Sequence, residues 1–168
     1  MILILDQNNA NYLDSTYYLL KMKKTKHTIG RVERIDFPLW KMNDIEAKID
    51  TGAYTSSIHC HDIEEFEKDG DKLVRFNLLD PEHPSYEDHI FELPIHDKRV
   101  VKSSNGQSSL RYFIQTVVRI FEEEFKIELS LTDRSEMRFP ILIGRKFLKK
   151  RFIVDVAKKN LSLKSRGS

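Results

Sequence analysis

Short runs of alternating apolar and polar residues dominate the chain from Thr28 onward. Ile45, Ala47 and Ile49 alternate with polar neighbours, and this period of two is typical of half-buried β-strands. The run 141–144 is apolar and ends in glycine, which indicates a buried strand. Many short strands separated by turn signals, with little helix, predict an all-β fold, either a small barrel or a sandwich.

The same pattern predicts the connections and the remaining elements. Asn105-Gly106 is a strong hairpin signal, and it lies between the valines at 100–101 and the strand pattern of 112–120. We therefore expect a long hairpin with a polar tip. Short helical segments are predicted at 62–66 and 145–150. Further strands are expected at 57–61, 72–78, 90–95 and 126–131, and a closing hairpin at 152–156 and 161–163.

The length of 168 residues is sufficient for one domain with a true core. Residues 1–26 combine an apolar start, three tyrosines and a basic run, and we interpret them as an N-terminal arm that is disordered or packs on a partner. Residues 27–164 form the predicted domain, and 165–168 form a polar tail.

Composition limits the expected partners and compartment. Lysine and arginine number 28 against 26 acidic residues, and the net charge of +2 gives no general attraction to nucleic acid. The single cysteine, Cys60, excludes an internal disulfide and fits a reducing compartment. Asp6 ends the apolar start before it reaches the length of a signal or membrane segment. We therefore expect a cytoplasmic protein that contacts neither membrane nor nucleic acid.

The strand at 45–49 leads directly into Asp50-Thr51-Gly52-Ala53. Glycine lets the backbone approach the carboxylate, and the hydroxyls and amides that follow stabilise its ionised form. Two facing carboxylates hydrolyse amides, because one stays protonated while the other takes a proton from water. The chain has a single Asp-Thr-Gly, so the second copy must come from another molecule. The alternative is a β-turn whose aspartate caps its own backbone.

Three elements in this order resemble the retropepsin-like aspartic peptidases: the strand into Asp50, the Asn105-Gly106 hairpin, and the apolar-glycine run at 141–144 followed by a short helix. The resemblance implies that these are the catalytic loop, the flap and the segment that threads past the catalytic loop. It also implies a small closed barrel of the acid protease type, with a flap hairpin and one short C-terminal helix.

A closer resemblance, covering residues 27–157, is to the bacterial and archaeal subfamily labelled "ATP-dependent zinc protease". That subfamily is associated with the ATP-grasp glutamate ligases that modify ribosomal protein tails. The motifs that carry this resemblance are 48–53, Ser56, His59, 102–106, Arg111, 131–137 and 140–145.

The resemblance implies an aspartic endopeptidase that acts as a homodimer. Asp50 from each subunit would hold one water, and Thr51 would hydrogen-bond across the dimer axis. Gly52 and Ala53 would place amides near the carboxylates. The predicted catalytic residues are Asp50, Thr51 and Gly52.

The subfamily label itself finds little support in the residues. The chain has no P-loop, so nothing indicates ATP binding. His59-Cys60-His61 places two histidines on one face of a strand, and His83, His89 or His96 would have to supply further zinc ligands, but no spacing singles them out. No cofactor or metal is expected, although a zinc-dependent peptidase remains an alternative.

Basic residues on or beside the motif loops suggest the substrate. Arginine binds carboxylates with two parallel hydrogen bonds, so a cleft lined by these residues would favour acidic or glutamate-rich peptide tails. Structural ion pairs beneath the barrel, formed by Arg111, Asp133 and Arg134, are the alternative. A non-catalytic dimeric binding module with the same barrel is the remaining alternative for the whole chain. The predicted substrate-binding residues are Ala53, Ser56, His59, Lys102, Asn105, Gly106, Arg111, Arg134 and Arg145.

Overall fold

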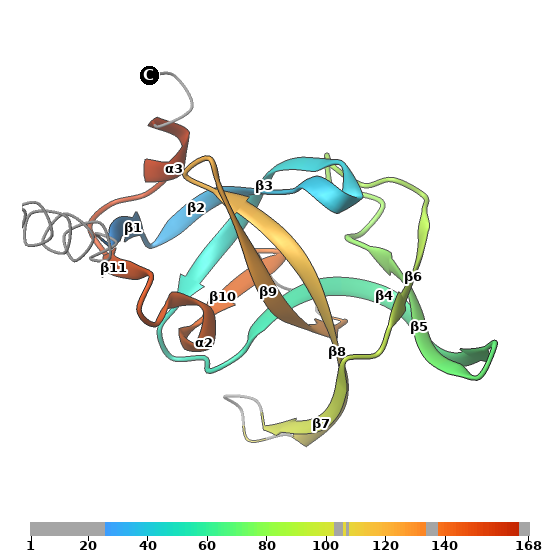
Figure 1. The fold of residues 1–168 in the computed structure, drawn as a ribbon. Coiled ribbons are helices and arrows are strands. Elements are labelled where there is room, and N and C mark those ends of the chain that lie inside the picture. The colour runs from blue at the N-terminus through green and yellow to red at the C-terminus, as the bar shows by residue number, and fades with distance from the viewer. Residues whose placement is uncertain (1–25, 103–105, 107, 134–137, 165–168) are drawn as a thin grey trace, which may run out of the picture.

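A computed structural model gives the structure of the protein and describes residues 26–102, 106, 108–133 and 138–164. Strands dominate this part of the chain (Figure 1), which confirms the predicted all-β fold. The strands are β1 (His27–Gly30), β2 (Val32–Phe37), β3 (Met42–Asp50), β4 (Ser56–Lys68), β5 (Asp71–Leu78), β6 (Ile90–Pro94), β7 (Asp97–Lys102), β8 (Ser108–Ile120), β9 (Glu123–Thr132), β10 (Ile141–Gly144) and β11 (Phe152–Asp155). The helical segments are η1 (Pro38–Trp40), α2 (Arg145–Leu148) and α3 (Leu161–Lys164).

The strands β10, β3, β2, β8, β9 and β4 pair in that order, and β10 also pairs with β4. The last strand therefore returns to the first, and the strands close into a ring. β10 runs parallel to β3 and antiparallel to β4. The alternating pattern of the sequence points one face of each strand into the ring, where Ile45, Ile58 and Leu129 are fully buried. Burial of these side chains is the main stabilising term of such a core.

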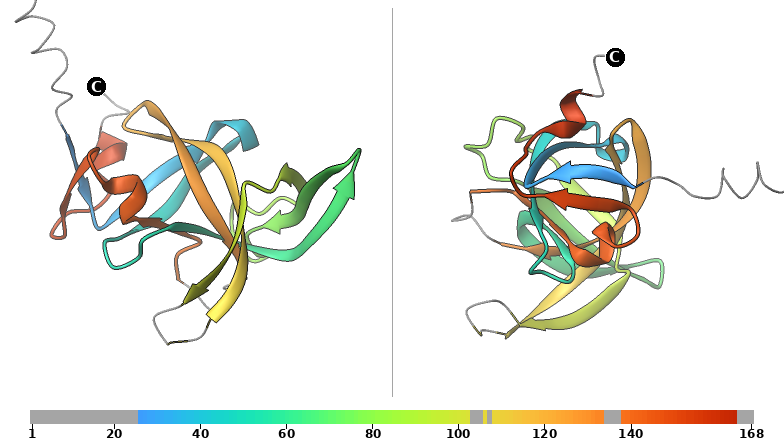
Figure 2. Two further views of the ribbon diagram at one scale, coloured as in Figure 1. Left: turned by 60° about the horizontal axis from the view of Figure 1, so that its bottom comes forward. Right: turned by 90° about the vertical axis from the view of Figure 1, so that its left-hand side faces the viewer.

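The outer part of β4 leaves the ring and pairs antiparallel with β5, which in turn pairs with β6. Figure 2 shows these strands projecting from the body of the molecule. Gly70, at a φ of +85°, makes the turn between β4 and β5. A helical turn predicted at 62–66 is wrong, because β4 continues through it. The register shifts between His61 and Glu64, and Asp62 has a φ of +53°, so its turn preference is absorbed by a β-bulge.

The two ends of the described chain meet at one side of the ring, where β1 pairs in parallel with β11 (Figure 2). Glu33 of β2 is fully buried. Its carboxylate accepts hydrogen bonds from the backbone amides of Gly30 at 2.6 Å and Ser162 at 2.8 Å. A closing hairpin with a strand at 161–163 is therefore a wrong prediction. Segment 161–164 is a second short helix, α3, because its first turn docks on Glu33, and β11 takes β1 as its partner.

The hairpin predicted around Asn105-Gly106 is formed by β7 and β8, whose register runs from Asp97 opposite Phe113 to Lys102 opposite Ser108. Asn105 lies outside the described residues. The predicted helix after 141–144 is α2. No helix in the described ranges is long and apolar enough to cross a bilayer.

Candidate active site

The Asp50 turn, residues 50–55, connects β3 to β4. Asp50 is the last residue of β3, and its Oδ1 accepts hydrogen bonds from the backbone amides of Gly52 at 2.9 Å and Ala53 at 3.1 Å. Two hydrogen bonds to one oxygen favour the ionised carboxylate and fix its orientation. The carboxylate is half-buried, whereas Thr51 and Gly52 are exposed. The turn therefore holds a carboxylate in a defined orientation at the surface of the ring.

β10 passes directly behind this turn. Gly144 lies opposite Asp50 in the parallel register with β3, and its amide donates to the hydroxyl of buried Ser56 at 3.1 Å. A Cβ at Gly144 would lie 2.5 Å from the carbonyl oxygen of Thr55, closer than real Cβ atoms come. Glycine is required here because the two backbones touch.

α2 holds the other side of the turn. The guanidinium of Arg145 donates to the carbonyls of Thr51 at 2.8 Å and Gly52 at 2.7 Å. The backbone amides of Arg145 and Lys146 donate to the carbonyls of Ala53 and Tyr54, each at 2.9 Å. Four hydrogen bonds from two consecutive residues therefore fix the carbonyl side of the Asp50 turn.

A surface pocket of about 550 Å³ borders the exposed side of the turn. Its lining mixes apolar side chains with cations. The cations come from α2 and the residue after it, and Lys149 is exposed. The lining residues are Thr51, Tyr54, Arg145, Lys146, Leu148, Lys149, Phe152 and Val154.

The structure brings Asp50, Thr51, Gly52, Ala53 and Arg145 together, and Ser56 supports the same turn from behind. Arg145 stabilises the turn by donating hydrogen bonds to two of its backbone carbonyls, a role that the sequence did not indicate.

The other predicted binding residues that the structure describes do not line the pocket beside the turn. His59 is buried, with Nε2 2.8 Å from Asp80 Oδ2, and Arg111 is buried, with Nε donating to Ser109 Oγ at 3.1 Å. Lys102 and Gly106 are exposed at the end of the β7–β8 hairpin, and Gly106 has a φ of +86°. Arg134, like Asn105, lies outside the described residues.

The two histidines of the His59-Cys60-His61 motif each pair with a separate carboxylate and do not converge on a shared metal position. His59 faces Asp80, and Nδ1 of His61 lies 2.8 Å from Asp62. Within the described ranges, no group of three or more histidine, cysteine and acidic side chains has the geometry to hold a metal ion.

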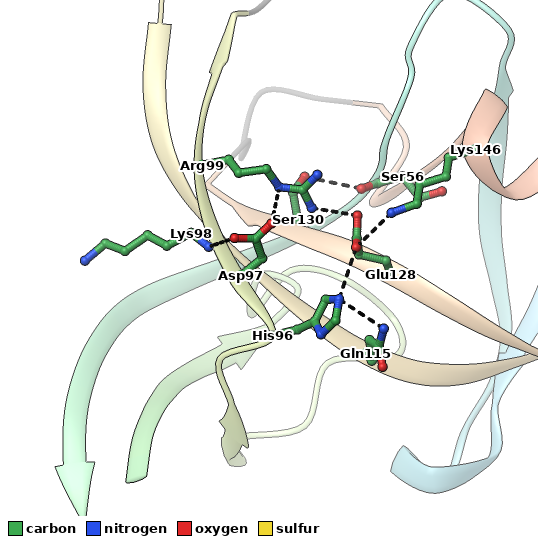
Figure 3. Close-up of polar contacts among 9 residues, drawn as sticks. All are labelled: Ser56, His96, Asp97, Lys98, Arg99, Gln115, Glu128, Ser130 and Lys146. Atoms are coloured by element: carbon green, nitrogen blue, oxygen red, sulfur yellow. Dashed lines mark hydrogen bonds and ion pairs between the residues drawn. The ribbon is translucent and has the colours of Figure 1, made fainter. Parts of the chain in front are cut away.

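One charged cluster beside the turn was missed in the sequence. Glu128 of β9, with a side chain only 10% exposed, accepts hydrogen bonds from Arg99 at 2.7 Å and Lys146 at 2.9 Å, and its Oε2 lies 3.4 Å from His96 Nε2 (Figure 3). Burial disfavours its charge, but the hydrogen bonds from Lys146 and Arg99 outweigh burial and lower the pKa of Glu128 below its ordinary value. These partners are 18 to 32 positions away in the chain, so no local spacing signals the cluster.

The ring of strands, the glycine that packs behind an Asp-Thr-Gly turn and the helix that follows it define a retropepsin-type fold. Residues 28–165 match the model of the RimB-like family, described as retropepsin-like aspartic endopeptidase RimB. The chain belongs to this family, which confirms the predicted fold class.

Among curated proteins, similar sequences are found in longer chains. A probable alpha-L-glutamate ligase of Desulfotalea psychrophila is 37% identical over 136 residues, covering 79% of this chain and 28% of the ligase. A protein of the same name from Shewanella pealeana is 36% identical over 138 residues, covering 80% and 29%. The chain thus spans less than a third of the length of these curated relatives. Their names agree with the predicted association with glutamate ligases.

A crystal structure of a Legionella pneumophila protein of unknown function has a similar fold. It aligns with a TM-score of 0.68 and 26% identity over 82% of this chain and 99% of that chain. The similarity supports the fold, but it carries no activity with it.

Proposed function

We propose that the protein is an aspartic endopeptidase that acts as a homodimer. The observation that carries this proposal is the Asp50 turn, in which two amides orient one oxygen of an accessible carboxylate. The RimB-like family assignment supports the same reaction class. One chain supplies one Asp-Thr-Gly, and a twofold axis beside the exposed turn would supply the second.

In the proposed reaction, the two Asp50 carboxyls share one proton, because two like charges about 3 Å apart cannot both ionise. The ionised carboxylate takes a proton from a water held between them as that water attacks the peptide carbonyl. The protonated carboxyl donates a hydrogen bond to the carbonyl oxygen. The proton taken from water then passes to the leaving amine, so the peptide bond breaks and the pair returns to its starting state.

Asp50→Asn tests this proposal. The variant keeps the shape of the turn but lacks both carboxyls of the proposed pair, one in each subunit, so peptide cleavage is expected to fall by about 100-fold or more, with dimer mass and thermal unfolding unchanged. Asp88→Asn, in the exposed loop before β6, is the matched control and should retain full activity. Undiminished cleavage by Asp50→Asn, or a monomer that cleaves at a rate independent of concentration, would overturn the proposal.

We further propose that the substrate is acidic. Arg145 and Lys146 are already bound to the fold, but Lys149 presents an exposed cation to the pocket beside the turn. The names of the longer relatives, which refer to glutamate ligation, point to the same chemistry.

Paired peptides of equal length, one rich in glutamate and one with glutamine in its place, test the substrate class. We expect kcat/KM to be about tenfold higher for the glutamate peptide, and the difference to shrink in high salt because exposed charges are screened. Lys149→Glu should remove the preference, whereas Lys68→Glu, at the far end of β4, should leave it intact. Equal rates on both peptides would remove this proposal without affecting the peptidase proposal.

A dimeric binding module is the second candidate. The observation that favours it is that relatives named as ligases carry this region as less than a third of their length. If the protein is such a module, wild type and Asp50→Asn should bind glutamate peptides with the same affinity, and neither should cleave them.

A further inference from the structure

Glu128 connects three separate elements beside the candidate active site. Arg99 belongs to β7, Glu128 to β9 and Lys146 to α2. Figure 3 shows His96, Arg99 and Lys146 pointing toward the Glu128 carboxylate. Arg99 binds Oε1 and Lys146 binds Oε2, so each carboxylate oxygen has a cation from a different element. We call this set of residues the Glu128 clamp: His96, Arg99, Glu128 and Lys146.

On the α2 side, Lys146 belongs both to the clamp and to the hydrogen bonds that hold the Asp50 turn. The Lys146 side chain binds Glu128 at 2.9 Å, while its backbone amide donates to the carbonyl of Tyr54 at 2.9 Å. Arg145, its neighbour, binds the carbonyls of Thr51 and Gly52. A shift of α2 would therefore move the turn that orients Asp50.

On the hairpin side, the clamp fixes one face of β7. The Arg99 guanidinium stacks 3.7 Å from the Phe113 ring centroid, and its Nε lies 2.8 Å from Asp97. Arg99 thus approaches Glu128 from a fixed direction. Lys98, the preceding residue on the same strand, pairs instead with Glu65 of β4 and does not join the clamp.

We propose that Glu128 is a positioning residue that couples strand β7 of the hairpin to the Asp50 turn through Lys146. This role rests on the proposed peptidase function for its effect on catalysis, although the coupling itself does not depend on that function. The Glu128 side chain is only 10% exposed and holds one cation on each carboxylate oxygen, so replacing either cation breaks the connection between β7 and α2. Small displacements of a catalytic group are costly, since about 1 Å can reduce the rate about 100-fold.

The test is whether a change on β7 is felt at the Asp50 turn. In Arg99→Gln, the amide resonances of Gly52 and Ala53 are expected to shift, and kcat to fall about tenfold with KM changed less than about threefold. Arg99→Lys keeps the charge and should restore most of both. The same Arg99→Gln change made in a Glu128→Gln background should add little, because the connection is already broken.

Lys98→Gln is the matched control, since it removes a cation from the same strand outside the clamp, and it should leave the Gly52 and Ala53 resonances in place. Unshifted resonances in folded Arg99→Gln, an equal shift in Lys98→Gln, or an undiminished effect in the Glu128→Gln background would each overturn the coupling. The amide resonances decide the matter even for a protein without peptidase activity. Should Arg99→Gln fail to fold, His96→Gln contacts the same carboxylate from the segment before β7 and replaces it in every comparison.

Discussion

At the scale of single residues, the site depends on contacts between backbone atoms as much as on side chains. Asp50 is oriented by the amides of Gly52 and Ala53. Glycine is also required at position 144, because the backbone there lies against that of Thr55 and leaves no room for a Cβ. A position can therefore be essential to this site without contributing any chemical group.

Gly144→Ala is expected to destabilise the protein by about 1–3 kcal/mol, the usual range for overpacking, and to displace the Asp50 turn. The added Cβ would meet the carbonyl oxygen of Thr55 at 2.5 Å, and backbone cannot move as a side chain can. Denaturant unfolding measures the change. Gly70→Ala is the comparison, since a Cβ there has no atom within 4 Å and only the positive φ adds a cost. A Gly144→Ala protein as stable as wild type would contradict the packing argument.

At the scale of elements, β10 and α2 act as one unit that supports the turn from behind and from the side. β10 inserts between β3 and β4, and α2 follows with four hydrogen bonds to the turn carbonyls. The Glu128 clamp then joins α2 to β9 and β7. This clamp is charged, so its contribution to stability depends on pH.

Glu128→Gln tests that pH dependence. The folded-state pKa of Glu128 lies below its ordinary value of 4.5, so the stability that its ionisation contributes is fully present above about pH 4.5. It is lost as pH falls through the folded-state pKa. The difference in unfolding free energy between wild type and Glu128→Gln should therefore shrink as pH falls below about 4.5. A difference that stays constant from pH 7 to pH 3 would contradict this account.

At the scale of the whole molecule, two long-range connections close the structure, one within the ring and one beside it. β10 joins β3 to β4, and Glu33 joins the first described strand to the last helix by accepting the amides of Gly30 and Ser162. Both closures link segments that are far apart in the chain. The fold that carries the site is therefore stabilised by contacts that form only when the whole chain is assembled.

Glu33→Gln should weaken that second closure. The side-chain amide would turn its NH₂ group toward one of the two backbone N–H donors, leaving a buried donor without an acceptor at a cost of about 1–3 kcal/mol. The melting temperature should fall accordingly, and hydrogen exchange should increase at Gly30 and Ser162. Glu67→Gln, exposed near the end of β4, should leave both unchanged. A Glu33→Gln protein as stable as wild type would show that the carboxylate is not needed.

Much of this fold follows from local patterns, and the two wrong predictions fell where contacts with distant parts of the chain decided the structure. The alternation around Ile45 and the apolar run at 141–144 predicted β3 and β10, and the run after Gly144 predicted α2. The segment 62–66 was predicted as a short helical segment, but it continues as β4 and pairs with β5. The strand predicted at 161–163 became α3 because Glu33 captures the amide of Ser162, a contact across 129 positions.

The strand content, the family resemblance and the position of the Asp50 turn follow from the order of the amino acids, because alternation, glycine and aspartate act within a few neighbouring residues. The hydrogen bonds of Arg145 to the turn carbonyls and the contacts of Glu128 with β7 and α2 became known only from the folded chain. Those contacts connect residues 18 to 94 positions apart in the chain, so they form and stabilise the protein only once the ring has closed.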